Sequence, residues 1–187
     1  FNHGLFLHVP KGITIDTPIQ VLFITTEQDN KPHASYLRHF ILLEEKAQCN
    51  VSLQFIGLDN ATYLSNHVTE IHANAQANAE INLIQSESSQ ASHFHGLKAN
   101  LQESSQLKVN THVFQGKLIR NNVDLQLLGQ EAYCSLNGLN TLNADSKAFH
   151  HTVIQHTVEN CQSDQLYKSI LDGHSEAEFD ATIVVAK

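Results

Sequence analysis

The sequence predicts an all-β protein in which strands stack as the coils of a solenoid. Apolar and polar residues alternate in many short segments, small residues recur ahead of these segments at intervals of about 28 residues, and two-residue hairpin signals are scarce. Alternation of period two is typical of strands, and a repeat of this length is typical of stacked supersecondary units. We therefore expect a mostly β chain with a repeating core.

Period-two alternation marks the individual strands. The alternating apolar positions are Ile13 and Ile15; Val51, Leu53 and Phe55; Ile81 and Leu83; Leu107 and Val109; Val123, Leu125 and Leu127; and Phe179, Ala181, Ile183 and Val185. Since alternate side chains of a strand point to the same face, these positions should face the core. In the last segment we expect Phe179 and Val185 to be buried, and residues 163–171 are the one place where a short helical turn is expected.

The repeat is carried by small residues that precede the strands. Ala47, Ala77, Ser105, Ala132 and Ser175 are separated by 30, 28, 27 and 43 residues, and a weaker copy spans residues 144–152. Small residues at these positions suit the corners of a β-solenoid. An irregular sandwich or jelly roll is the structural alternative, but the hairpin signals are confined to "LNGL" at 136 and "LDG" at 171.

Composition restricts the classes of function. The 187 residues, 41% of them hydrophobic, suffice for a single domain, residues 1–187. The net charge of -8 comes without a basic stripe, which argues against nucleic acid as a partner. No apolar run approaches the roughly 20 residues that span a bilayer, so we expect no membrane contact and a cytoplasmic location.

The cysteines favour neither a disulfide framework nor a closed zinc site. Cys49, Cys134 and Cys161 are odd in number, far apart and without the close pairing of a zinc ribbon. The sequence also contains no glycine-rich phosphate loop. Nucleotide binding by this chain is therefore not expected.

Two histidines form the first candidate metal pair. His93 and His95 in "HFHG" should lie on one face of a strand, an arrangement that can bind a metal and that resembles the His-x-His of cupins, which are jelly-roll proteins. The next acid, Glu103, follows eight residues later, and no glycine-rich segment precedes the pair. A cupin-type metal-dependent enzyme is thus the alternative function, and an ordinary strand pair is the simpler explanation.

A second candidate lies in "HHTVIQHTVENC", residues 150–161. His150 and His156 should share one strand face, His151 should point the other way, and Cys161 follows a turn at "VEN". Mixed imidazole and thiolate ligands suit iron, zinc or an iron–sulfur species. We expect at most an open half-site from His150, His156 and Cys161, while the structural alternative is that these side chains satisfy one another at a corner.

Three segments resemble the core domain of the SufB/SufD family. They are "GLFLHVPKGITIDTPIQVLF" at 4–23, "RHFILLEEKAQCNV" at 38–51, and above all "HHTVIQHTVENCQSDQLYKSILDGHSEAEFDATIVV" at 150–185. The resemblance covers essentially the whole chain, and the last segment is more similar to SufD than to SufB. It implies a right-handed parallel β-helix.

The resemblance also implies a function. It indicates a non-catalytic scaffold subunit of iron–sulfur cluster assembly that works with a SufB-like protein and a SufC-like ATPase, and a homodimer formed through the β-helix is a further expectation. No cofactor should be held stably by this chain, although a transient iron–sulfur cluster at a partner interface is expected. The family's Cys-x-His motif and its terminal helical regions, which bind SufC, are expected to lie outside this chain.

Overall fold

A computed structural model describes residues 3–26, 33–58 and 61–186 and contains thirteen strands in two parallel sheets. Sheet A consists of the odd-numbered strands β1 (Phe6–Val9), β3 (His33–Leu43), β5 (Tyr63–Ala73), β7 (Ser92–Leu101), β9 (Leu118–Leu127), β11 (Lys147–His156) and β13 (Glu176–Val185). Sheet B consists of the even-numbered strands β2 (Thr14–Thr25), β4 (Gln48–Gly57), β6 (Asn78–Ser86), β8 (Gln106–Gln115), β10 (Tyr133–Leu142) and β12 (Gln162–Leu171).

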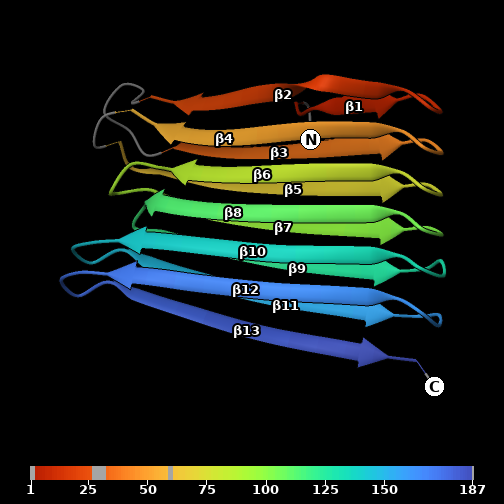
Figure 1. Cartoon of the computed structure of the whole chain (residues 1–187). Helices are drawn as coiled ribbons and strands as arrows, with labels where there is room; N and C mark the ends of the chain where they lie inside the picture. Colours follow the sequence, from red (N-terminus) through yellow and green to blue (C-terminus); the bar gives the residue numbers. More distant parts are fainter. Residues whose placement is uncertain (1–2, 27–32, 59–60, 187) are drawn as a thin grey trace.

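The chain alternates between the two sheets, and each strand stacks on the strand of the same sheet one coil away (Figure 1). Every strand pairing is parallel. This arrangement confirms the predicted parallel β-solenoid and excludes the jelly roll, whose strands pair antiparallel. The described parts of the chain contain no helix, and therefore no helix that is long and apolar enough to cross a membrane.

The helical turn expected at residues 163–171 is wrong, because this segment is strand β12. It pairs with β10 over its whole length, and its alternate residues Ser163, Gln165 and Tyr167 point inward. Because the inward residues Ser163 and Gln165 are polar, a search for alternating apolar residues does not detect this strand.

Small residues occupy four of the corners where sheet A leads into sheet B, as the repeat predicted, whereas the corner between β1 and β2 has Ile13 after the left-handed Gly12. The four residues Ala47, Ala77, Ser105 and Ala132 are fully or almost fully buried, and each follows a residue in the left-handed backbone region, namely Lys46, Gln76, Ser104 and Glu131. Cys161 follows the left-handed Asn160 and therefore occupies the fifth corner of this row. Ser175, by contrast, lies at the opposite side of the solenoid, between β12 and β13, which explains the step of 43 residues, about one and a half coils.

The interior has an apolar half and a polar half. Near the ends of the sheet A strands, one in-register column is wholly aliphatic: Ile41, Ile71, Ala99, Leu125 and Ile154. Near the starts of the same strands, another column consists of His67, His95, Asn121 and His150, each 2% exposed. Sheet B faces this polar column with Gln85 and Asn140, so polar groups of both sheets meet inside the solenoid.

The last coil shows how side chains fit into the interior. Gly138 of β10 leaves room for the ring of Tyr167, since a Cβ atom at Gly138 would lie 2.1 Å from that ring. Tyr167 in turn stacks on Phe179 of β13, with ring centroids 4.1 Å apart. A glycine in the middle of this strand is therefore explained by packing.

Two residues expected to be buried are exposed. Phe179 and Val185 occupy inward positions of β13, in register with His150 and His156 of β11, but they are 43% and 67% exposed. The expected strand face is correct, whereas the expected burial is wrong, because no further described coil stacks on β13.

This difference gives a testable prediction for one interior column. Leu127, His156 and Val185 stack in register, with Leu127 fully buried and Val185 mostly exposed. We expect Leu127→Asp to lower the free energy of unfolding by several kcal/mol, because a buried unpaired carboxylate is costly, and its matched control Val185→Asp to lower it by less than about 1 kcal/mol. Urea unfolding measures both, and equal losses would contradict the assigned burial of this column.

Candidate functional site

His93 and His95 lie on one strand face, as predicted, but they do not form a cupin-type site. Both point into the interior from β7, with 0% and 2% exposure. Glu103, the acid that follows them in the sequence, lies exposed in the turn after β7 and cannot join them. The parallel strand pairing already excludes the jelly roll, so the cupin alternative is wrong.

The structure separates the three residues of the second candidate site. His150 is buried in the interior, where its Nε2 contacts Asn140 Oδ1 at 2.8 Å. His156 lies at the end of β11, about 20 Å further along the strand, with its Nε2 2.9 Å from Ser163 Oγ. His150 therefore does not join His156 and Cys161.

His156 and Cys161 line one cavity of about 570 Å³ at the corner between β11 and β12. We call it the corner cavity; Gln130, Thr157, Val158, Glu159, Asn160, Val185 and Ala186 complete its lining. The thiol of Cys161 donates to the carbonyl oxygen of Gly129 at 3.3 Å. Within the described residues, no group of three or more His, Cys, Asp or Glu side chains is arranged to hold a metal ion.

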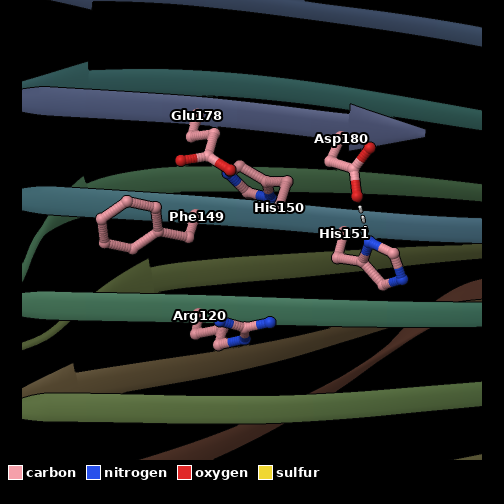
Figure 2. A pocket seen from close by; sticks show the side chains of 6 residues that line it. All are labelled: Arg120, Phe149, His150, His151, Glu178 and Asp180. Carbon is pink, nitrogen blue, oxygen red and sulfur yellow. Dashed lines mark hydrogen bonds and ion pairs between the residues drawn. The ribbon is translucent and has the colours of Figure 1, made fainter.

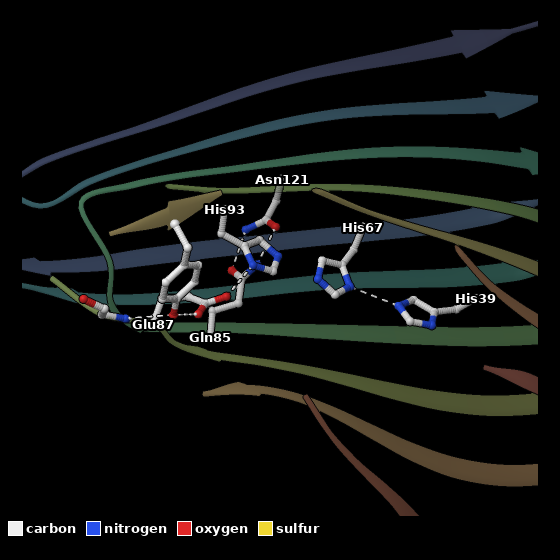
Figure 3. Close-up of polar contacts among 8 residues, drawn as sticks. His39, His67, Gln85, Glu87, His93 and Asn121 are labelled. Carbon is white, nitrogen blue, oxygen red and sulfur yellow. Dashed lines mark hydrogen bonds and ion pairs between the residues drawn. The ribbon is translucent and has the colours of Figure 1, made fainter. Parts of the chain in front are cut away.

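A larger cluster of titratable side chains lies inside the solenoid. We call it the interior cluster; it consists of His39, Tyr63, His67, Glu87, His93 and His95, all of them buried. Figure 3 labels four of these residues, namely His39, His67, Glu87 and His93. His67 lies between the others, with its ring stacked on His39 at 5.4 Å and on His93 at 5.2 Å between centroids. The edges of His67, His93 and His95 also pack against Phe55.

Glu87 is the one carboxylate buried among the described residues, and two side chains hydrogen-bond to it. Its Oε1 lies 2.6 Å from His93 Nδ1, and its Oε2 accepts from the hydroxyl of Tyr63. The Tyr63 oxygen also accepts from the backbone N–H of Ser88 at 3.2 Å. These contacts satisfy both carboxylate oxygens, which a buried acid requires.

The hydrogen bonds at His39 fix the direction of a short chain. The backbone N–H of Leu5 donates to His39 Nδ1 at 3.2 Å, so this nitrogen carries no proton. His39 Nε2 then carries the proton of the neutral ring and donates to His67 Nδ1 at 3.1 Å. His95 makes a separate contact, with its Nε2 2.8 Å from Thr69 Oγ1.

Burial keeps four of the interior imidazoles neutral, those of His39, His67, His95 and His150. Desolvation lowers the pKa of His39 and of His150 to about 4. Desolvation, together with the neighbouring His93 and His39, lowers the pKa of His67 to about 2, and burial likewise lowers the pKa of His95 well below its usual value. At neutral pH these four rings are hydrogen-bonding groups without charge.

Sequence reasoning missed His39, His67, Tyr63 and Glu87. The coil repeat carries a signal that could have found two of them, because His39, His67 and His95 are separated by 28 and 28 residues. Glu87 and Tyr63 lie next to turns of irregular length, and no spacing rule connects them with His93.

A shallow groove of about 230 Å³ lies on the outer face of sheet A (Figure 2). Arg120, Phe149, His151, Glu178 and Asp180 contribute outward side chains, and His151 Nδ1 lies 2.7 Å from Asp180 Oδ2. The side chains of this pair are 39% and 60% exposed, so the pair contributes little to stability. His151 thus points away from His150, as the alternation predicted.

The lowered pKa values predict a stability that depends on pH. In the unfolded chain these four histidines take up protons below their ordinary pKa of 6.5, whereas in the fold His39 and His150 do so only near 4 and the other two at lower pH. Stability should therefore be complete above about pH 6.5 and fall as the pH is lowered, by up to about 1.4 kcal/mol per pH unit for each ring.

Urea unfolding at pH 7, 6 and 5 measures this dependence. His150→Gln should reduce its slope, whereas His174→Gln should leave it unchanged, because the His174 side chain is 93% exposed. A free energy of unfolding equal at pH 7 and pH 5 would contradict the lowered pKa values of these four histidines.

Comparison with known proteins agrees with this architecture. Residues 23–187 match the family model described as SUF system FeS cluster assembly, SufBD core domain. Protein ABCI7, chloroplastic, of Arabidopsis thaliana is 26% identical over 188 residues, which cover 97% of this chain and 39% of the relative. The iron-sulfur cluster assembly protein SufD of Escherichia coli is 25% identical over 183 residues, which cover 96% of this chain and 43% of the relative.

The chain thus spans about two fifths of the length of these relatives. The family model, by contrast, begins within β2 and extends through β13, so it covers most of the solenoid. The sequence resemblance, the parallel solenoid and the family match therefore lead to the same assignment: the chain belongs to the SufB/SufD core-domain family of the SUF iron–sulfur cluster assembly system.

Proposed function

We propose that this chain is the core of a non-catalytic scaffold subunit that works in the cytoplasm with a SufB-like protein and a SufC-like ATPase. The observation that carries the proposal is the match of residues 23–187 to the SufBD core domain. The name of the Escherichia coli relative, iron-sulfur cluster assembly protein SufD, supports the same role. The interior cluster is sealed from solvent, which suits a structural role better than turnover of a substrate.

The positions of the cysteines support a chain that does not hold a cluster by itself. Cys49 and Cys134 point into the interior, where burial raises their thiol pKa to about 11 and about 12. They are therefore protonated at neutral pH, whereas cluster ligands are thiolates. Cys161 alone is partly accessible, at the corner cavity.

The corner cavity is the place on this chain where a transient cluster could be shared. His156 and Cys161 supply one imidazole and one thiol to its lining. Two such ligands fall short of the roughly four that an iron–sulfur cluster needs. In this proposal a partner chain completes the ligand set, and His150 takes no part in it.

The edges of the sheets support association through the C-terminal coil. The N-terminal edge strand β2 is interrupted by a register shift between Ile15 and Ile19 and contains Pro18, two features that discourage edge pairing. β12 and β13 pair regularly with β10 and β11 on one side and leave their other edges free in the described structure. A second solenoid, either a SufB-like chain or another copy of this chain, is the proposed partner of these edges.

Reconstitution with iron and sulfide tests the proposal for the cysteines. We expect the isolated chain to hold clearly less than one cluster per chain, measured as iron and acid-labile sulfide after desalting. Cys161→Ser should change the melting temperature by less than about 2 °C, because Ser105 occupies the equivalent corner in another coil. Near-stoichiometric iron and sulfide that disappear in Cys161→Ser but persist in the control Cys49→Ser would contradict it.

A further inference from the structure

Four buried imidazole nitrogens have no hydrogen-bond partner among the described residues, and one of them, Nδ1 of His33, belongs to a partly exposed residue at the start of β3. The other three lie inside the solenoid and are Nε2 of His93, Nδ1 of His95 and Nδ1 of His150. The rings themselves are 0%, 2% and 2% exposed, so solvent outside the molecule does not reach them. Buried polar atoms are paired in the great majority of cases, and each exception requires a physical explanation.

The neighbours of His150 fix what its free nitrogen needs. Asn140 donates through Nδ2 to Ser169 Oγ at 3.0 Å, so its Oδ1 faces His150 and accepts from Nε2–H at 2.8 Å. In the neutral ring, Nδ1 is then a bare acceptor. The missing group is therefore a hydrogen-bond donor.

His93 leads to a related conclusion. Its Nδ1 faces a carboxylate oxygen of Glu87 and must donate to it, which leaves Nε2 as an acceptor in the neutral ring and as a donor in the charged ring. His95 lies two residues along the same strand face, and its free Nδ1 lies in the same half of the interior. A hydrogen-bond partner for His93 Nε2 and His95 Nδ1 must therefore be a group that can both donate and accept.

Water fits these requirements better than a metal ion does. A buried cation needs a compensating charge, and the one buried carboxylate of the described residues, Glu87, is already bonded to Tyr63 and His93. The described chain also offers no cluster of three ligands. A buried water molecule both donates and accepts, and such molecules typically satisfy otherwise unpaired polar groups.

An amide pair divides the interior between these nitrogens. Asn121 is the direct register neighbour of both His95 and His150, and it exchanges two hydrogen bonds, 3.0 and 2.9 Å long, with Gln85 of the opposite sheet. This pair spans the interior from sheet B to sheet A (Figure 3). We propose that the polar half of the interior contains at least two internal water sites, one at His93 and His95 and one at His150, separated by the Gln85–Asn121 pair.

Oxygen-17 magnetic relaxation dispersion counts water molecules with long residence times in the folded chain. We expect at least two in the unmodified protein, about one fewer in His150→Leu, and no change in the exposed control His174→Leu. His95→Leu should remove or weaken the other site and leave the site at His150 in place. Circular dichroism of each variant establishes that the comparison is made between folded proteins.

Three results would overturn the proposal. The first is an unmodified protein without long-lived water, a measurement that does not depend on the folding of any variant. The second is a dispersion unchanged in both interior variants. The third is elemental analysis that finds about one metal ion per chain, lost in His95→Leu or His150→Leu, which would replace water by a metal as the ligand.

Discussion

In-register parallel stacking is the constraint on which the rest of this structure depends. Each inward residue lies directly beside its counterpart in the next coil, about 4.8 Å away, so a side chain must suit both of its neighbours in the column. The aliphatic column from Ile41 to Ile154 meets this condition through packing. The side chains in the column from His67 to His150 suit their neighbours through hydrogen bonds and stacked rings. Their partners include Gln85 and Asn140 of the opposite sheet and His93 of the adjacent column.

Polar residues inside the solenoid link its two sheets. Gln85 hydrogen-bonds to Asn121, Asn140 to His150, and Glu87 to His93. In each pair the first residue lies in a strand of sheet B or directly after one, and the second lies in a strand of sheet A. Apolar packing in the aliphatic half of the interior is non-directional, whereas these hydrogen-bonded pairs have defined geometry. We infer that the polar half fixes the relative position of the sheets, and with it the positions of the outer strand edges and of the corner cavity that a partner would contact.

Much of the fold could be predicted from the sequence, because the solenoid repeats its requirements. Ala47, Ala77, Ser105 and Ala132 revealed the corners, and the alternation in β4, β6 and β8 revealed the inward faces. The pattern failed where a residue's environment depends on another coil. Phe179 has the expected face, but no coil among the described residues covers it, and Ser175 belongs to the opposite corner although its local sequence resembles the others.

The candidate sites were less predictable for the same reason. Strand alternation correctly placed His93 and His95 together, but the partner of His93 is Glu87, which lies before it in the sequence, in the connection between β6 and β7. His150 and His156 share a strand face yet lie too far apart to act together, and Cys161 occupies a corner that in four other coils is filled by alanine or serine. Spacing along one strand shows which side chains share a face, whereas contacts across coils depend on the register of the whole solenoid.

The central claim is that buried polar groups stabilise this fold as matched pairs between the sheets, and a double-mutant cycle at Gln85 and Asn121 tests it most directly. Each of Gln85→Leu and Asn121→Leu leaves one buried amide unpaired and should lower the free energy of unfolding by about 1–3 kcal/mol. The double variant removes both amides, so its loss should be smaller than the sum of the single losses by at least about 1 kcal/mol. Losses that add to within about 0.5 kcal/mol would contradict the claim.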